Sequence, residues 1–175
     1  MKKIKFGIIG VGRLGYEHAC NLAARVPQAE LVAICDGNLD RAKEVAEELG
    51  VPYVYSDPAK MCENPEVEAV AIITNTASHV DMIEICMNAG KHVFCEKPLA
   101  DTVEKCKKAE AIVEAHPELT FMLGFMRRFD LSYRLANQKM EAGEIGDVVL
   151  VRCYSQDPVS IIKGTLEYAP RSGGQ

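Results

Sequence analysis

Short apolar runs alternate along this chain with longer segments in which apolar residues recur at helical spacing. The runs predict strands at residues 4–9, 31–35, 53–55, 69–74, 92–95 and 120–124. The intervening segments predict a helix after Gly15 and others at 40–49, 78–89 and 101–115, the last one capped by Asp101. Strands that alternate with helices are typical of parallel βαβ units. Because such crossovers are right-handed, we expect an α/β fold with a doubly wound parallel sheet.

The pattern changes after residue 124. Residues 131–142 predict another helix, residues 148–154 are strongly strand-forming, and residues 157–175 show no period. An apolar strand needs partner strands, and the remaining sequence supplies none. We therefore expect residues 1–146 to form one Rossmann domain, and residues 147–175 to be the truncated start of an α+β substrate domain.

A glycine-rich loop joins the first apolar run to the first predicted helix. Gly10 allows a tight turn, Gly12 has no side chain to block a phosphate, and Gly15 lets the helix pack close to the strand. The peptide N–H groups at the start of this helix, at Arg13 and Leu14, would face a dinucleotide pyrophosphate. The order of strand, glycines and helix therefore predicts a dinucleotide site.

Asp36 follows the second apolar run, where a carboxylate would hydrogen-bond the adenosine ribose hydroxyls. At about 4 Å, this carboxylate would repel each unit of charge on the extra phosphate of NADP by ~1 to 4 kcal/mol. The expected cofactor is therefore NAD. The alternative is that Asp36 is a turn residue, because aspartate favours turns whatever the ligand.

Glu96, Lys97 and Pro98 follow the strand predicted at 92–95, at its carboxyl end, where open α/β sheets bind their ligands. Pro98 keeps Lys97 extended, so the ammonium projects past the strand, while Glu96 points the other way. Such a lysine can donate a hydrogen bond to a substrate oxygen and, once desolvated, exchange a proton with it. The alternative is a solvated surface lysine.

Polar residues also follow the run at 69–74. Thr74, Asn75 and His79 end a strand and open a helix, so they are candidates to line the nicotinamide side of a cleft. Ser78 and His79 are equally suited to cap that helix and form its first turn. Both interpretations stay open on the sequence.

Composition excludes several classes of function. A net charge of −5 and a pI near 5.4 argue against nucleic acid as a partner. No apolar run is long enough for a signal peptide or a membrane span, so we expect a cytoplasmic protein without a membrane partner. The seven cysteines include no Cys-x-x-Cys pair, which predicts buried free thiols and no metal site.

Several motifs together, in their order and spacing, resemble the oxidoreductase family of glucose–fructose oxidoreductase, inositol dehydrogenase and the rhizopine-catabolism protein. These motifs are the glycine loop, Asp36, residues 74–79 and Glu96-Lys97-Pro98-Leu99. Residues 124–130 and 144–146 are similar to the inositol 2-dehydrogenase branch. The resemblance covers nearly the whole chain.

This resemblance implies NAD-dependent hydride transfer to or from a CH–OH carbon of a polyol or sugar. Lys97 matches the family's catalytic lysine, and Glu96 joins the expected cofactor contacts. Met126 and Arg127 match positions near the polyol, and Asp157 falls at a comparable polar contact; the alternative is surface charge plus a core methionine. Family members also use an aspartate and a histidine beyond a Gly-Gly pair, and often form homo-oligomers. We therefore expect a truncated chain.

Two other functions compete with a dehydrogenase. One is a dinucleotide-binding or sensor module without turnover, and the other is a methyltransferase, which also uses a glycine loop and a following acidic residue. Glu96-Lys97-Pro98 favours the dehydrogenase over the methyltransferase, because methyl transfer has no evident use for that lysine.

Overall fold

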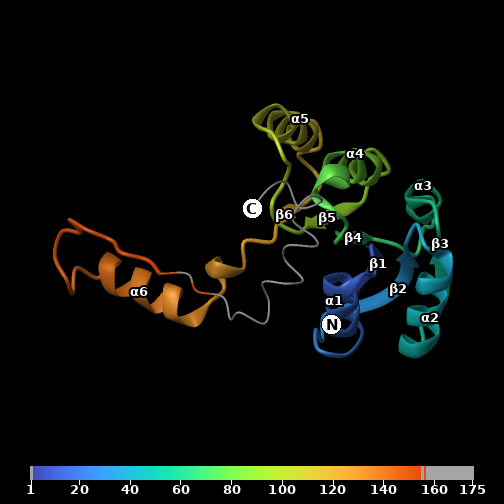
Figure 1. Ribbon diagram of the computed structural model, residues 1–175, viewed down its shortest axis with the longest axis horizontal. Coiled ribbons are helices and arrows are strands. Elements are labelled where there is room, and N and C mark those ends of the chain that lie inside the picture. Colours follow the sequence, from blue (N-terminus) through green and yellow to red (C-terminus); the bar gives the residue numbers. More distant parts are fainter. Residues whose placement is uncertain (1, 155, 157–175) are drawn as a thin grey trace. The chain divides into compact units, whose positions relative to one another are not determined.

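The computed structural model describes residues 2–154 and 156. Six parallel strands form one sheet in the order β3-β2-β1-β4-β5-β6 (Figure 1). The order reverses between β1 and β4, which confirms the predicted doubly wound sheet. The strands are β1 (Ile4–Ile9), β2 (Ala29–Cys35), β3 (Tyr53–Tyr55), β4 (Ala69–Ile72), β5 (His92–Cys95) and β6 (Phe121–Leu123).

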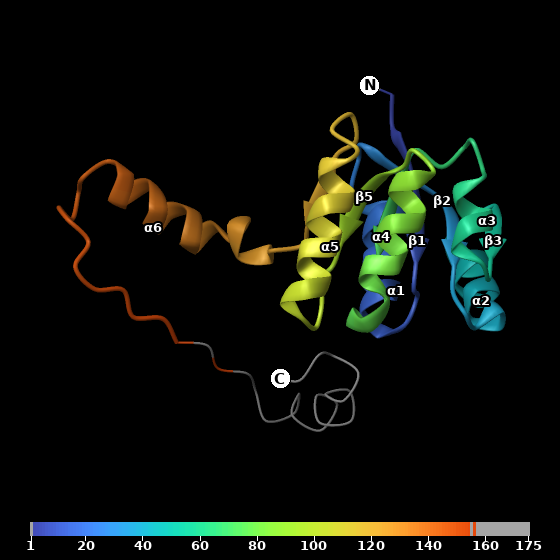
Figure 2. The same cartoon turned by 90° about the horizontal axis from the view of Figure 1, so that it is seen from above.

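Helices cover both faces of this sheet (Figure 2). One apolar core includes residues of α1 and α2, and a second core includes residues of α3, α4 and α5. In β1, Ile8 belongs to the first core and its neighbour Ile9 to the second, because successive strand residues point to opposite faces. The helices are α1 (Arg13–Ala24), α2 (Leu39–Leu49), α3 (Pro58–Cys62), α4 (His79–Asn88) and α5 (Val103–Glu114), with a 3₁₀ turn, η1 (Thr76–Ser78), before α4.

The presence of helix α3 and the cap of α5 differ from the sequence prediction. Helix α3 was not predicted, yet Asp57 caps it by accepting a hydrogen bond from the Ala59 N–H, and Pro58 opens it. The predicted cap of α5, Asp101, is wrong. Thr102 is the cap and accepts from the Lys105 N–H, whereas Asp101 forms an ion pair with the Lys105 ammonium.

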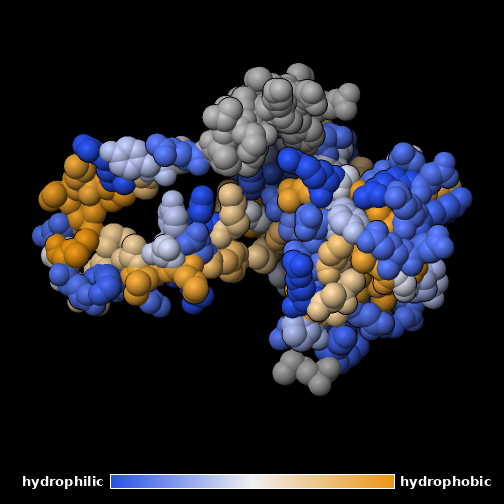
Figure 3. Space-filling view, turned by 60° about the horizontal axis from the view of Figure 1, so that its bottom comes forward, coloured by the Kyte–Doolittle hydropathy of each residue, from blue (hydrophilic) through white to orange (hydrophobic). Residues whose placement is uncertain are grey.

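The chain divides into two compact units after Gly124. The second unit begins at Phe125 and contains η2 (Met126–Arg128) and α6 (Leu131–Glu141). The strand predicted at 148–154 is wrong, because these residues form no ladder with any described strand. Without a partner its apolar side chains stay exposed, with Val149 at 95%. Figure 3 shows that apolar residues lie among polar ones on the surface of the described residues. The proposed domain boundary near residue 146 remains a prediction.

The cysteines form no disulfide bonds. All seven cysteines are free; Cys35, Cys62, Cys86 and Cys95 are buried, whereas Cys153 is exposed. In the described part of the chain, no cluster of three or more acidic, histidine or cysteine side chains is arranged to hold a metal ion. No helix among the described residues combines the length and the hydrophobicity needed to cross a membrane.

Candidate cofactor and active site

The turn from β1 into the first turn of α1 has room for glycine alone at two positions. Gly10 adopts φ +90°, and a Cβ there would lie 2.7 Å from the Ile73 carbonyl oxygen. A Cβ on Gly15 would lie 2.0 Å from the Gly10 carbonyl oxygen. A Cβ on Gly12, in contrast, would meet nothing within 4 Å. The first and third glycines therefore shape the loop, while the second keeps open space in front of it.

Helix α1 starts at this open space. Gly12 is its N-cap, and no side chain caps the first turn, so its N–H groups are available to an external anion. Arg13 and Leu14 are both exposed there. The arrangement fits the diphosphate bridge of a dinucleotide.

Asp36, at the end of β2, is hydrogen-bonded to the glycine loop. Its Oδ2 accepts from the Val11 N–H at 2.8 Å, and its Oδ1 accepts from the Asn38 N–H at 2.8 Å. A carboxylate has about four acceptor positions, so these bonds leave capacity for two ribose hydroxyls. The bonds also fix the carboxylate's orientation, which the sequence did not predict.

Glu96 and Lys97 lie at the carboxyl end of β5. Lys97 is exposed, and its backbone N–H donates to Glu96 Oε2 at 3.0 Å. The other oxygen of Glu96 lies 3.1 Å from His18 Nε2 on α1. Partial burial acts to raise the pKa of Glu96, but the bonds to His18 and to the Lys97 N–H outweigh it and lower that pKa. Glu96 therefore remains a carboxylate that anchors the Lys97 backbone.

The lowered pKa of Glu96 makes its stabilising effect depend on pH. This contribution is present above the unfolded-state pKa, near 4.5, and is lost as pH falls through the lower folded-state pKa. Glu96→Gln removes the charge with little change of shape. We expect the variant to unfold at a lower urea concentration than wild type at pH 7. This difference in urea concentration should shrink at about pH 3.5. A difference of equal size at both pH values would contradict this assignment.

The residues after β4 take different positions. Asn75 is exposed and Thr74 is half-buried, with its hydroxyl accepting from the Ser78 hydroxyl at 2.8 Å. Ser78 makes no side-chain cap for α4. His79 is only 1% exposed, and both of its ring nitrogens contact backbone carbonyls. Its ring is thus enclosed by protein at the start of α4.

Parallel strands bring these residues to one edge of the sheet. The glycine loop, Asp36, Thr74 and Lys97 follow β1, β2, β4 and β5, which are consecutive neighbours in the order β2-β1-β4-β5. Their carboxyl ends meet at the point where the strand order reverses, the usual ligand site of such sheets.

The remaining predicted site residues lie elsewhere in the chain. Met126 and Arg127 belong to the second unit, where Arg127 forms an ion pair with Asp130 at 3.0 Å and lies over the Tyr133 ring. Asp157 lies outside the described residues. The structure thus brings together the cofactor-side residues, and the predicted polyol contacts stay predictions.

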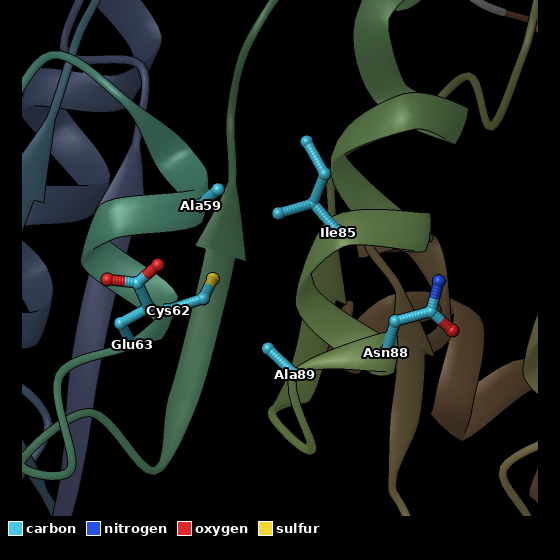
Figure 4. Close-up of a pocket in the computed structure, with 6 residues that line it drawn as sticks. All are labelled: Ala59, Cys62, Glu63, Ile85, Asn88 and Ala89. Atoms are coloured by element: carbon cyan, nitrogen blue, oxygen red, sulfur yellow. The ribbon is translucent and has the colours of Figure 1, made fainter.

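A separate hollow of about 360 Å³ lies between α3 and α4 (Figure 4). Its lining includes Cys62 on α3 and Asn88 and Ala89 at the end of α4. Helix α4 leads from the carboxyl end of β4 to the amino end of β5, so this hollow lies toward the opposite edge of the sheet from Lys97. None of the predicted site residues lines it.

Comparison with known proteins agrees with this geometry. The model of the oxidoreductase family with an NAD-binding Rossmann fold matches residues 4–125. The chain belongs to this family. The family resemblance and the fold class predicted from the sequence are therefore confirmed.

Similar family members carry inositol dehydrogenase names. The scyllo-inositol 2-dehydrogenase (NAD(+)) of Bacillus subtilis (strain 168) is 39% identical over 92% of this chain and 48% of its own length. The myo-inositol 2-dehydrogenase of Thermotoga maritima is 39% identical over 98% of this chain and 50% of its own. A crystal structure of scyllo-inositol dehydrogenase from Lactobacillus casei, with bound NAD(H) and scyllo-inositol, superposes with a TM-score of 0.90 at 40% identity, covering 96% and 49% of the two chains. The chain spans about half the length of these relatives.

Two residues that contribute to the site carried no clear signal in the sequence. His18 contacts Glu96 from α1, and its ring centre lies 5.7 Å from that of Phe94. Arg41 donates from Nε to the Val11 carbonyl oxygen at 3.3 Å and lies over the Tyr16 ring. Both act across elements, so local spacing could not identify them.

Proposed function

We propose that this chain is the cofactor-binding half of an NAD-dependent dehydrogenase that oxidises a CH–OH group of an inositol-like polyol or a sugar. The observation that carries the proposal is the shared edge at which the glycine loop, Asp36 and Lys97 meet. The names of the relatives support the substrate class. For the full-length protein we also propose self-association.

The residues at this edge fit the cofactor. The N–H groups at the start of α1 would bind the diphosphate across the space that Gly12 leaves open, and Asp36 would accept hydrogen bonds from the adenosine ribose. Thr74, Asn75 and Glu96 would line the nicotinamide half. When bound, NAD supplies a ring that accepts a hydride.

Lys97 would act on the substrate oxygen. Its ammonium would donate a hydrogen bond to the oxygen of the hydroxyl being oxidised and stabilise the negative charge that develops there. The hydroxyl proton would pass to a separate base, the role that the family resemblance gives to the histidine beyond the Gly-Gly pair, as the hydride passes to NAD. In the opposite direction, the same ammonium would polarise the carbonyl while that base, now protonated, returns the proton to the oxygen. Met126, Arg127 and Asp157 are proposed as further polyol contacts.

Calorimetry with NAD and NADP tests the cofactor site directly. We expect NAD to bind at least about tenfold more tightly, because the Asp36 carboxylate repels the extra phosphate of NADP. Asp36→Asn removes the negative charge, so the preference for NAD over NADP should narrow. The amide oxygen can still accept one of the two backbone hydrogen bonds that Asp36 accepts. Equal affinities of the wild-type protein for NAD and NADP would contradict the role assigned to Asp36. Absence of binding to either cofactor would contradict the proposed cofactor site.

Activity of the full-length protein tests the reaction. NADH formation is followed by absorbance with myo-inositol, scyllo-inositol and glucose as separate substrates. NAD binding without turnover on any polyol or sugar would leave the dinucleotide-binding module as the better description.

A further inference from the structure

His79 joins the two backbone segments that flank the candidate site. Its ring Nδ1 lies 2.9 Å from the Pro98 carbonyl oxygen, and its Nε2 lies 3.2 Å from the Thr74 carbonyl oxygen. Thr74 follows β4 and Pro98 follows β5, two adjacent strands. The ring therefore links two loops that no backbone ladder connects at this point.

The acceptor chemistry of the two carbonyls restricts which ring nitrogen of His79 can donate a hydrogen bond. Carbonyl oxygens only accept hydrogen bonds, so a ring nitrogen that bonds one must carry the hydrogen, and a neutral ring carries hydrogen on one nitrogen alone. Only one of the two contacts is then a hydrogen bond. The Nδ1 contact is the shorter of the two, and its distance is ordinary for an N–H···O bond. Because the ring is 1% exposed, it meets a cofactor or substrate only through the backbone that it holds.

Lys97 is held at its backbone and free at its side chain. The Lys97 N–H donates to Glu96, and the carbonyl of the next residue, Pro98, contacts His79. Among the described residues, no hydrogen bond or ion pair engages the Lys97 ammonium. The fixed backbone sets the point from which the Lys97 side chain extends, and its unengaged ammonium is available as a donor to a substrate.

We propose that His79 is a positioning residue for Lys97, a role that rests on the proposed dehydrogenase function. Its Nδ1–H donates to the Pro98 carbonyl and fixes the segment that carries Lys97 at the end of β5. The ammonium then stays aimed at the substrate oxygen. His79 thus supports the site through the backbone at Pro98, and its ring contributes no direct cofactor contact.

Two polar substitutions test the contributions of the two ring nitrogens of His79 separately. The amide nitrogen of His79→Asn takes the place of Nδ1, whereas that of His79→Gln takes the place of Nε2. In the full-length protein, we expect the Asn variant to keep kcat within about threefold of wild type, and the Gln variant to lose about 10- to 100-fold. NAD affinity should change by less than about twofold in both. Equal loss in both variants would overturn the positioning role.

Nuclear magnetic resonance of the wild-type protein gives a second test that does not depend on how the variants fold. Long-range ¹⁵N–¹H correlation identifies which nitrogen of His79 carries hydrogen, and we expect it on Nδ1. A bare Nδ1 would overturn the proposal. Failure of the underlying function gives a different result, because the wild-type protein would then bind NAD and form no NADH. If the wild type is active and the Asn and Gln variants have the same kcat, only the role of His79 is contradicted.

Discussion

Lys97→Met in the full-length protein is expected to reduce NADH formation from inositols by about 10² to 10⁴-fold, the range for loss of a positioned acid or base. Methionine has a similar length but no proton to donate. NAD affinity should remain nearly unchanged, because the cofactor contacts proposed for the glycine loop and Asp36 lie on other strands. Initial rates and calorimetry on the same preparation measure both quantities.

Lys107→Met provides the matched control, since Lys107 is an exposed lysine on α5. It should leave both the rate and the affinity at wild-type values. Preserved turnover in Lys97→Met would remove Lys97 from the mechanism. A parallel loss of NAD affinity in that variant would instead make Lys97 a cofactor-binding residue.

The sheet could be predicted because its central strands are buried on both faces. Such strands appear as continuous apolar runs between glycines and helix caps, and β4 illustrates this with four buried residues in succession. Helix α3 was missed because five residues are too few to show a helical period. The strand expected at 148–154 fails for a different reason, since local strand propensity does not form a ladder without a partner.

The site was predictable to the extent that it follows local spacing. The glycines, Asp36 and Lys97 each occupy a fixed place relative to a strand end, and the strand order then brings them together. The contacts that orient them join residues far apart in sequence, such as Val11 with Asp36 and His18 with Glu96. These pairings depend on helix packing, which one sequence does not specify.

The same loop geometry predicts different effects on stability for substitutions at Gly15 and Gly12. Gly15→Ala places a methyl group 2.0 Å from the Gly10 carbonyl oxygen, so strand and helix must separate. We expect a loss of about 3 kcal/mol in the free energy of unfolding, measured by urea denaturation, together with weaker NAD binding.

Gly12→Ala should leave the fold nearly intact and still weaken NAD binding. Its methyl group meets no protein atom within 4 Å, so the unfolding free energy should stay within about 1 kcal/mol of wild type. The same methyl group enters the space assigned to the diphosphate, and NAD affinity should fall by about tenfold or more. Gly37→Ala, which is equally unhindered, is the control for affinity. If Gly12→Ala bound NAD as tightly as Gly37→Ala, the diphosphate could not lie against this loop, whatever the effect of Gly15→Ala on stability.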